Sequence, residues 1–226
     1  MNNKGKLIVI DGTDGSGKTT QFELLKKAIV SKGYQIESMH FPQNGHKSAG
    51  LVEEYLSGKY GNANEVDPYT ASVFYAVDRY DASFKIRDWL SSGKLVLLDR
   101  YIQANMGHQS GKIKNKISRD KYLDWLYNLE FNIFNIPKPD LVIILSVDPK
   151  KSISLIKERN KKDGLKKDRD IHENLEHIKQ AYEGYIFSAK KYNWKIINCV
   201  DKLGNLRTIE DISKEVYDIV IKELKN

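Results

Sequence analysis

The sequence predicts an α/β protein in which five parallel strands form a central sheet between two layers of helices. Two observations predict this class. Apolar runs rich in Val, Ile and Leu alternate with segments of helical periodicity, as in repeated strand–helix units. Most of these runs lack a strict alternation with polar residues, which is typical of strands buried on both faces. The runs are Leu7–Asp11, Gln35–Phe41, Leu95–Asp99, Leu141–Val147 and Lys195–Asn198.

Helical segments separate these runs, and start and stop signals mark several of their ends. Asp67 and Pro68 form an N-cap and first-turn pair for a long helix that ends near Gly93. Pro137 closes another helix, because proline cannot continue the backbone hydrogen bonding. The predicted helices are Thr19–Ser31, Pro68–Leu90, Arg119–Phe134, Asp170–Tyr192 and Thr208–Lys225.

The chain of 226 residues is 40% hydrophobic and 30% charged, and no Pro- or Gly-rich linker divides it. These features predict a single compact domain over residues 1–226. No apolar run approaches the roughly 20 residues of a membrane span, and Met1–Lys6 lack the apolar segment of a secretion signal. Cys199 is the only cysteine, so no intrachain disulfide can form. We therefore expect a reducing compartment, the cytoplasm.

The formal net charge of +7 has two interpretations. A basic excess can bind nucleic acid, or it can serve small polyanions such as nucleotides. Lysines are spread along the chain with one concentration near residues 157–169, and this local cluster favours a small anion. We therefore expect no nucleic-acid partner and no membrane partner. Much of the remaining excess fits an ordinary solvated surface.

The segment Gly12–Thr19 matches the phosphate-loop pattern G-x-x-x-x-G-K-[ST] between a predicted strand and a predicted helix. Its glycines let backbone amides approach a polyphosphate, and the helix N-terminus adds unpaired N–H groups. Lys18 can reach the β- and γ-phosphate oxygens, and the Thr19 hydroxyl can ligate Mg²⁺. A Gly-rich turn with a surface lysine is the alternative. The predicted ATP-binding residues of this loop are Gly12, Thr13, Asp14, Gly15, Ser16, Gly17, Lys18, Thr19 and Thr20.

A second pair of functional residues follows the third predicted strand. Ligands of open α/β sheets bind at the carboxyl ends of the strands, and Asp99 and Arg100 close the run Leu95–Leu98. If this strand is a neighbour of the first, Asp99 can hold Mg²⁺ through water. The planar fork of Arg100 suits a bidentate grip on a monophosphate. The alternative is a structural ion pair at a strand end.

Four segments together resemble the thymidylate kinase family of nucleoside monophosphate kinases. They are Gly12–Thr19, Phe41–Pro42, Tyr75–Tyr80 and Leu98–Tyr101, and Pro137–Asp140 adds to the likeness. The resemblance spans nearly the whole chain in order. It implies a three-layer P-loop fold, phosphoryl transfer from MgATP to dTMP to give dTDP for dTTP synthesis, and a homodimer.

The resemblance also implies an acceptor site. Tyr75 and Arg79 are four residues apart and share a helix face; they are implied to stack on the acceptor base and to hydrogen-bond a base carbonyl. A core aromatic and an arginine at the rim are the alternatives. Asp14 is implied to lie near the acceptor sugar and phosphate, with a loop residue that caps a local amide as the alternative. The other implied acceptor contacts are Phe41, Pro42, Asn105, His108 and Gln109, of which the last three have a solvated loop residue as the alternative.

The basic concentration falls where family members carry a mobile lid, at about residues 157–170 in this chain. Gly15 occupies a loop position that is arginine in some members, and members without that arginine supply cations from the lid. This implies that Arg169, with Arg159 or a lysine, closes over the transferring phosphoryl group and ATP. A solvated charged loop is the alternative. The expected catalytic residues are Asp14, Lys18, Arg100 and Arg169.

One departure from the family concerns the turn after Phe41–Pro42. Many members have an arginine there that contacts the acceptor phosphate, whereas this chain has Gln43 and Asn44. Acceptor binding must then depend more on Arg100 or on a lysine such as Lys47.

This departure leaves rival functions open. The nearest rival is a kinase of the same fold that acts on another deoxynucleotide or on a deoxynucleoside. A regulatory P-loop NTPase is a more distant rival, because it gives no role to the Asp99–Tyr101 segment or to Tyr75 and Arg79. A non-catalytic basic binding module is the third rival, and failure to bind ATP with Mg²⁺ would favour it.

Overall fold

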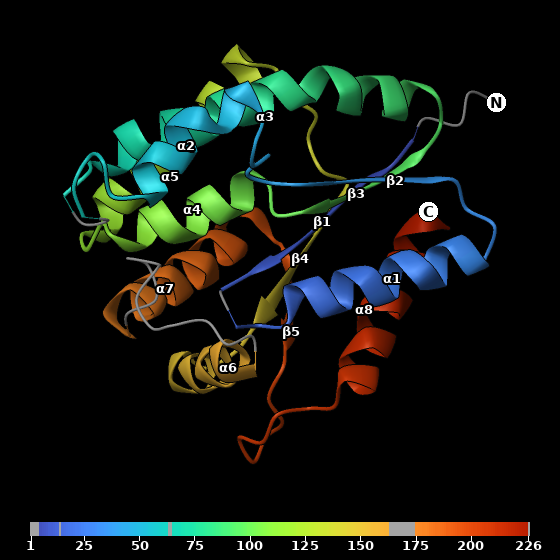
Figure 1. Cartoon of the computed structure of the whole chain (residues 1–226). Coiled ribbons are helices and arrows are strands. Elements are labelled where there is room, and N and C mark those ends of the chain that lie inside the picture. The colour runs from blue at the N-terminus through green and yellow to red at the C-terminus, as the bar shows by residue number, and fades with distance from the viewer. Residues whose placement is uncertain (1–4, 14, 63–64, 163–174, 226) are drawn as a thin grey trace.

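The computed structural model describes residues 5–13, 15–62, 65–162 and 175–225, and only the backbone of residues 157–162. Its centre is a five-stranded parallel sheet in the order β2-β3-β1-β4-β5 (Figure 1). The strands are β1 (Leu7–Gly12), β2 (Ile36–His40), β3 (Leu95–Asp99), β4 (Leu141–Ser146) and β5 (Lys195–Asn198). All five predicted strands are confirmed, and their ends differ from the predicted ones by at most one residue.

The burial of each strand follows its position in the sheet. Every residue of β1, β3 and β4 is buried, whereas the edge strands β2 and β5 are mostly half-buried or exposed. β1 pairs with β3 on one side, where Ile10 lies opposite Asp99, and with β4 on the other. The chain leaves β1 toward β2 but leaves β3 toward β4, so its direction reverses between β1 and β3. Ligands of open α/β sheets bind at such a reversal.

Helices cover both faces of the sheet and give the predicted three layers (Figure 1). One face packs against α1 and α8 through a core that includes Ile8 and Leu25. The other face packs against α3, α4, α5 and α7 through a core that includes Val9 and Tyr185. The helices are α1 (Lys18–Ser31), η1 (Lys47–Ala49), α2 (Gly50–Leu56), α3 (Pro68–Ser91), α4 (Ile102–Gly111), α5 (Lys116–Tyr127), η2 (Asn128–Ile133), α6 (Pro149–Lys162), α7 (Leu175–Tyr192) and α8 (Ile209–Leu224).

Capping residues confirm two of the predicted helix starts. The side chain of Asp67 accepts hydrogen bonds from two backbone amides in the first turn of α3, and Thr208 accepts one from Asp211 in α8. The helix predicted from Asp170 is described only from Leu175 onward. In the part of the chain that the structure describes, no helix combines the length and apolar character needed to cross a bilayer.

Two differences between the helical layer and the prediction bear on the site, and the short helix α2 is also not predicted. The helix predicted over Arg119–Phe134 is divided, because α5 gives way to the π-helical turn η2. Such turns are rare and are frequently found at functional sites. No helix is predicted over residues 102–111, where α4 forms. Its sequence, IQANMGHQSG, contains two glycines and has little helical periodicity.

Three glycines explain why α4 forms, because they let α4 and α7 cross at close range. A Cβ atom on Gly184 would lie 2.1 Å from the carbonyl oxygen of Gly107, and one on Gly111 would lie 2.1 Å from that of Gln180. A Cβ atom on Gly107 would lie 2.5 Å from the ring of Tyr185. Only glycine permits this contact, so tertiary packing overrides the weak local propensity of α4.

We predict that Gly184→Ala lowers the free energy of unfolding by about 2–3 kcal/mol, because the added methyl group must displace backbone atoms of α4. Urea denaturation measures this loss. Gly50→Ala is the matched control: Gly50 has ordinary helical φ and ψ angles and nothing within 4 Å of its added Cβ. It should stabilise the protein slightly. Equal behaviour of the two variants would contradict the close packing of α4 on α7.

Candidate active site

The phosphate loop connects β1 to α1 in a conformation that requires its glycines. Gly12 has a φ of 146° and Gly17 a φ of 80°, values that residues with a side chain rarely adopt. Lys18 opens α1, is only 6% exposed, and donates a hydrogen bond from Nζ to the carbonyl oxygen of Thr13 at 2.9 Å. The ammonium group therefore lies over its own loop, where a polyphosphate would bind.

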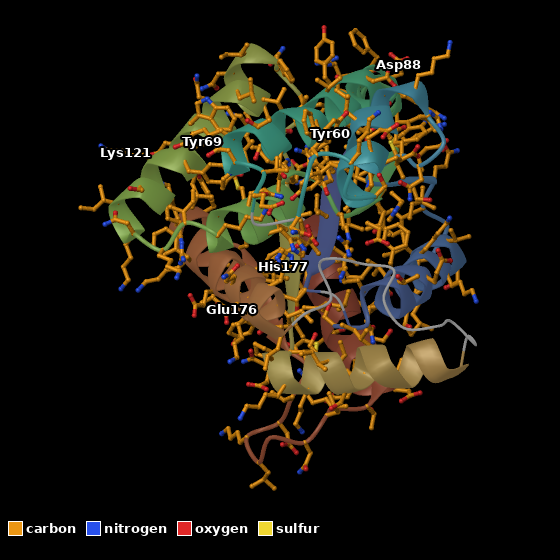
Figure 2. All side chains as sticks on the ribbon, turned by 60° about the vertical axis from the view of Figure 1, so that its left-hand side comes forward. Tyr60, Tyr69, Asp88, Lys121, Glu176 and His177 are labelled. Carbon is orange, nitrogen blue, oxygen red and sulfur yellow. The ribbon has the colours of Figure 1, made fainter. Side chains whose placement is uncertain are left out.

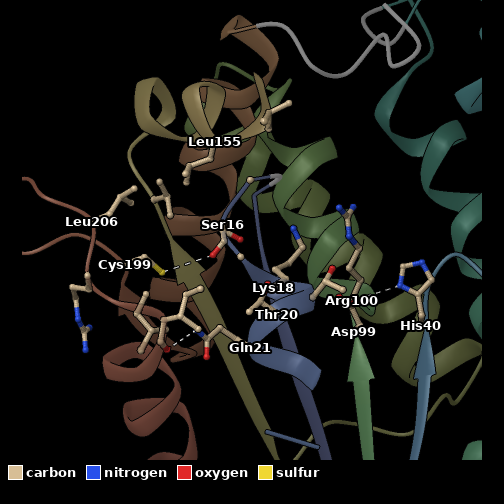
Figure 3. Close-up of a pocket in the computed structure, with 18 residues that line it drawn as sticks. Ser16, Lys18, Thr20, Gln21, His40, Asp99, Arg100, Leu155, Cys199 and Leu206 are labelled. Atoms are coloured by element: carbon tan, nitrogen blue, oxygen red, sulfur yellow. Dashed lines mark hydrogen bonds and ion pairs between the residues drawn. The ribbon is translucent and has the colours of Figure 1, made fainter. Parts of the chain in front are cut away.

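A cavity of about 410 Å³ opens beside this loop at the carboxyl edge of the sheet (Figure 3). Lys18, Asp99 and Arg100 lie at one end of it, and Leu155 and Leu206 lie toward the other. The structure thus brings the phosphate loop and the Asp-Arg pair together, as the sequence predicts. The predicted site residues that line the cavity are Gly15, Ser16, Gly17, Lys18, Thr19, Thr20, Asp99 and Arg100.

Arg100 and Asp99 leave the end of β3 in different directions. Arg100 has a left-handed φ of 66°, which is uncommon for a residue with a side chain and costs about 1 kcal/mol. Its amide donates to the carbonyl oxygen of Ile10 at 3.1 Å, which holds this turn against β1. Figure 3 shows the guanidinium of Arg100 extending beside Lys18.

Asp99 instead contacts a residue that the sequence did not predict in the site. Nδ1 of His40, the last residue of β2, lies 3.5 Å from Oδ2 of Asp99 (Figure 3). The other carboxylate oxygen, Oδ1, is buried and has no hydrogen-bond partner among the described residues. His40 also lines the cavity. The carboxyl-end rule could have identified it, because it ends a strand next to β3.

Asp11 is a buried carboxylate at the entrance to the phosphate loop. It is 0% exposed, and its Oδ1 accepts hydrogen bonds from the hydroxyl of Tyr185 and the amide of Gly12, both at 2.8 Å. Burial raises the pKa of Asp11 from 3.8 to about 6, although the positive charges of Arg100 and Lys18 oppose the rise. The carboxylate therefore carries its charge only partly near pH 6.

Tyr75 and Phe41, two residues predicted to contact the acceptor base, each pack against another aromatic ring. Tyr75 is half-buried on α3, and its ring lies 6.2 Å from that of Tyr55 in an edge-to-face arrangement. The ring of Phe41 lies 5.5 Å from that of Tyr101 and is 2% exposed, next to Pro42 and the cis peptide bond between them. Stacking of Tyr75 on a base stays a prediction, and its half-buried ring leaves surface for one.

Arg79 does not lie at the rim of the molecule, so that alternative is wrong. It is 1% exposed and forms a bidentate pair with Glu130 of η2, with both N···O distances at 2.6 Å. The preceding residue, Asp78, is also buried and accepts hydrogen bonds from the side chain and backbone of Gln43. Gln43, which follows the Phe41–Pro42 turn, is therefore directed toward α3.

The three predicted acceptor residues of the segment after Arg100 all lie on α4, so the solvated-loop alternative is wrong for them. Asn105 is 3% exposed and Gln109 is 2% exposed. Nδ2 of Asn105 lies 3.4 Å from the carbonyl oxygen of Ser72, which connects α4 to α3. Nδ1 of His108 lies 3.2 Å from Nε2 of His177. His177 is a buried residue of α7 and is labelled in Figure 2.

Three predicted residues cannot be placed in this site. Asp14 and Arg169 lie outside the described residues, and Arg159 is described only as part of the backbone of α6. Of the predicted lid, residues 157–162 are described only by their backbone, and residues 163–170 lie outside the described residues. Their roles stay predictions.

The apolar end of the cavity was not predicted from the sequence. Leu206 comes from the segment between β5 and α8, Ile209 is the first residue of α8, and Leu155 comes from α6. Val147 and Cys199 follow the ends of β4 and β5, so the carboxyl-end rule could have identified these two. The others have no local sequence signal, because they meet only through the fold.

A phosphate loop after β1, beside an Asp-Arg pair on the adjacent strand, defines a P-loop phosphotransferase that acts on nucleotides. Sequence comparison narrows this class. The profile of the thymidylate kinase family, described as "Thymidylate kinase", matches residues 10–208, and the chain belongs to this family.

Relatives and a solved structure agree with this membership. Thymidylate kinase from Danio rerio is 27% identical over 96% of this chain and 90% of its own length. That from Plasmodium falciparum is 28% identical over 97% and 93%. A solved thymidylate kinase from Candida albicans has the same fold, with a TM-score of 0.69 and 22% identity over 97% of this chain and 92% of that one. The predicted family and fold class are confirmed.

We predict that the stability of the wild-type protein falls relative to Asp11→Asn as the pH rises from about 4 to about 6. The unfolded chain loses the proton of Asp11 near pH 3.8 and the folded protein near pH 6, so deprotonation favours unfolding in this window. Once the pH is above this window, the free energy of unfolding of the wild type has fallen by about 3 kcal/mol relative to that of Asp11→Asn. Thermal unfolding at a series of pH values measures it. The exposed Asp218→Asn variant is the control, and parallel curves for wild type and Asp11→Asn would contradict the prediction.

Proposed function

We infer that this chain is a dTMP kinase, which transfers the γ-phosphoryl group of ATP to dTMP and gives ADP and dTDP. The observation that carries this proposal is the convergence of Lys18 and Arg100 on one cavity. One of the two cations would serve the triphosphate of ATP, and the other the monophosphate of dTMP. The acceptor oxygen of dTMP is already ionised, so no general base is needed. Catalysis then consists of alignment and of stabilising the charge of the transition state. The product dTDP would serve dTTP synthesis.

On the donor side, the loop amides and Lys18 bind the phosphates of ATP. The ammonium of Lys18 exchanges its bond to the carbonyl oxygen of Thr13 for phosphate oxygens. The apolar end of the cavity, with Leu155, Leu206 and Ile209, suits the planar adenine base. Arg159 and Arg169 are proposed to close over the phosphates as part of the lid.

The residues present also fit a magnesium ion. Oδ1 of Asp99 is buried without a partner among the described residues, and the hydroxyl-bearing Thr19 lines the same cavity. In the described chain, no group of three or more His, Cys, Asp or Glu side chains could hold a metal. Thr19 and Asp99 would therefore supply the protein ligands, and phosphate oxygens and water the rest. When bound, Mg²⁺ neutralises charge on the β- and γ-phosphates.

On the acceptor side, Arg100 is proposed to hold the phosphate of dTMP in a bidentate grip. Tyr75 stacks on the thymine, Phe41 and Pro42 close its other side, and Arg79 donates a hydrogen bond to a base carbonyl. Further contacts to the acceptor are proposed for Asp14, Asn105, His108 and Gln109. A kinase of another deoxynucleotide is the rival that an acceptor panel would separate.

We also propose a homodimer, supported by an apolar stripe on α3. Five residues spaced three or four apart lie on one side of this helix. They are exposed by 37–55%: Tyr69, Val73, Val77, Tyr80 and Phe84. Exposed apolar stripes of this kind are typical of protein interfaces. By contrast, Trp89 and Trp125 pack against the protein's own core.

A cytoplasmic location is proposed as well. Its support is the single cysteine, Cys199, which is buried as a free thiol, and proteins of oxidising compartments more often carry disulfides.

We predict that Lys18→Ala lowers kcat by on the order of 10³-fold, because it removes a charge-stabilising donor. A coupled assay of ADP release with each nucleoside monophosphate measures turnover and selects the acceptor. Lys26→Ala is the matched control on the same helix, since Lys26 contacts Ser38 instead of the cavity. Full activity of Lys18→Ala with dTMP would refute the assignment.

We predict that Val77→Glu converts the protein into a monomer, because a charge at the centre of the α3 stripe opposes burial of the facing copy. Sedimentation equilibrium should give twice the 26.0 kDa chain mass for the wild type and the chain mass for the variant. Val30→Glu places the same charge at an exposed position of α1 and should stay dimeric. A monomeric wild type would overturn the proposed dimer.

A further inference from the structure

Glu130 is a buried carboxylate to which the proposed site gives no role. It is 0% exposed and lies four residues after the buried Leu126, on the inward side of the helix that ends in η2. Its two oxygens accept from Nε and Nη2 of Arg79, each at 2.6 Å. Both side chains are almost fully removed from water.

This bidentate contact fixes the plane of the Arg79 guanidinium. Two parallel N–H···O bonds hold one edge of the fork, and neither of them uses Nη1. The remaining edge of the fork therefore points away from Glu130. A buried guanidinium held along one edge can present the donors of its other edge in only one direction, whereas a solvated arginine samples many.

The surroundings of the pair connect it to the acceptor site. Arg79 follows Tyr75 by one helical turn on α3. The buried hydroxyl of Tyr101, whose ring contacts Phe41, is close enough to be influenced by the charges of both Glu130 and Arg79. Burial opposes the charge of Arg79, but the attraction and hydrogen bonds of Glu130 outweigh it and hold the pKa of the guanidinium above its ordinary value. Arg79 is thus always a donor.

The charge balance of the pair suits an uncharged base. Because Glu130 neutralises Arg79 within the core, the site offers hydrogen-bond donors without a net positive charge. A carbonyl group can accept such a bond, whereas an exocyclic amino group would place donor against donor. A fixed donor edge therefore discriminates thymine from cytosine.

We propose that Glu130 is a positioning residue for selection of the acceptor base, and that it acts by aiming the edge of Arg79 that it does not itself bind at a carbonyl group of thymine. This inference rests on the proposed contact between Arg79 and the base. A merely structural role, in which the pair only ties α3 to η2, predicts lost stability with unchanged selectivity.

Glu130→Gln tests the proposal, because it keeps the shape of the side chain and turns an amide donor toward Arg79. We expect the ratio of kcat/KM for dTMP to that for dCMP to fall by about tenfold or more. The change should appear mainly in the KM for dTMP, with the KM for ATP within about twofold of the wild type. An unchanged ratio in a folded variant would overturn the proposal.

Glu130→Asp keeps the charge but withdraws the carboxylate by one methylene group. It should unfold closer to the wild-type temperature than Glu130→Gln, while its selectivity ratio still falls. If Glu130→Gln does not fold, this variant decides the question, and a wild-type ratio in Glu130→Asp then refutes the inference. Asp120→Asn is the control on α5, because it removes a carboxylate from a 2.6 Å ion pair with Lys191; its ratio should not change.

Arg79→Lys separates this inference from the proposed function. If this variant keeps the wild-type ratio, the contact between Arg79 and the base is wrong, and the inference about Glu130 fails with it. If Arg79→Lys lowers the ratio and both Glu130 variants do not, only the role of Glu130 is wrong. In the Arg79→Lys background, Glu130→Gln should cause no further fall, because the two residues act as one unit.

Discussion

The parallel pairing of β1 with β3 is the constraint on which the rest of this site depends. With Ile10 opposite Asp99, the phosphate loop and Arg100 leave the sheet side by side. The hydrogen bond from the amide of Arg100 to Ile10 then fixes the turn in which the arginine adopts its left-handed φ. A shift of register by one residue would turn Asp99 to the opposite face of the sheet. Lys18 and Arg100 reach the same cavity because β1 and β3 pair in this register.

On the acceptor side, α3 has the same organising role through two consecutive buried residues. Asp78 accepts hydrogen bonds from Gln43 and thereby holds the turn after Phe41–Pro42. Arg79 pairs with Glu130 and thereby holds η2. Gln43 therefore gives the turn a neutral anchor on α3. Neither Gln43 nor Asn44 carries a charge, and the dependence of the acceptor phosphate on Arg100 stays a prediction.

The sequence predicts those parts of the fold and site that depend on neighbouring residues. Buried strands and the glycine-lysine spacing of the phosphate loop are properties of short segments, so all five strands and Lys18 could be identified. α4 could not, because its glycines gain their value only against Gly184. Likewise, Tyr185 bonds to Asp11 across 174 positions of the chain and Glu130 to Arg79 across 51. No local pattern contains such a pair.

The crossing of α4 and α7 has a mechanical consequence. At Gly107 and Gly184 no side chain separates the two backbones, so α7 cannot shift toward α4 without displacing backbone atoms of α4. α4 carries Asn105 and Gln109, two residues predicted to contact the acceptor, and α7 is described from Leu175 onward. A displacement of α7 would therefore be passed directly to the helix that carries these two side chains.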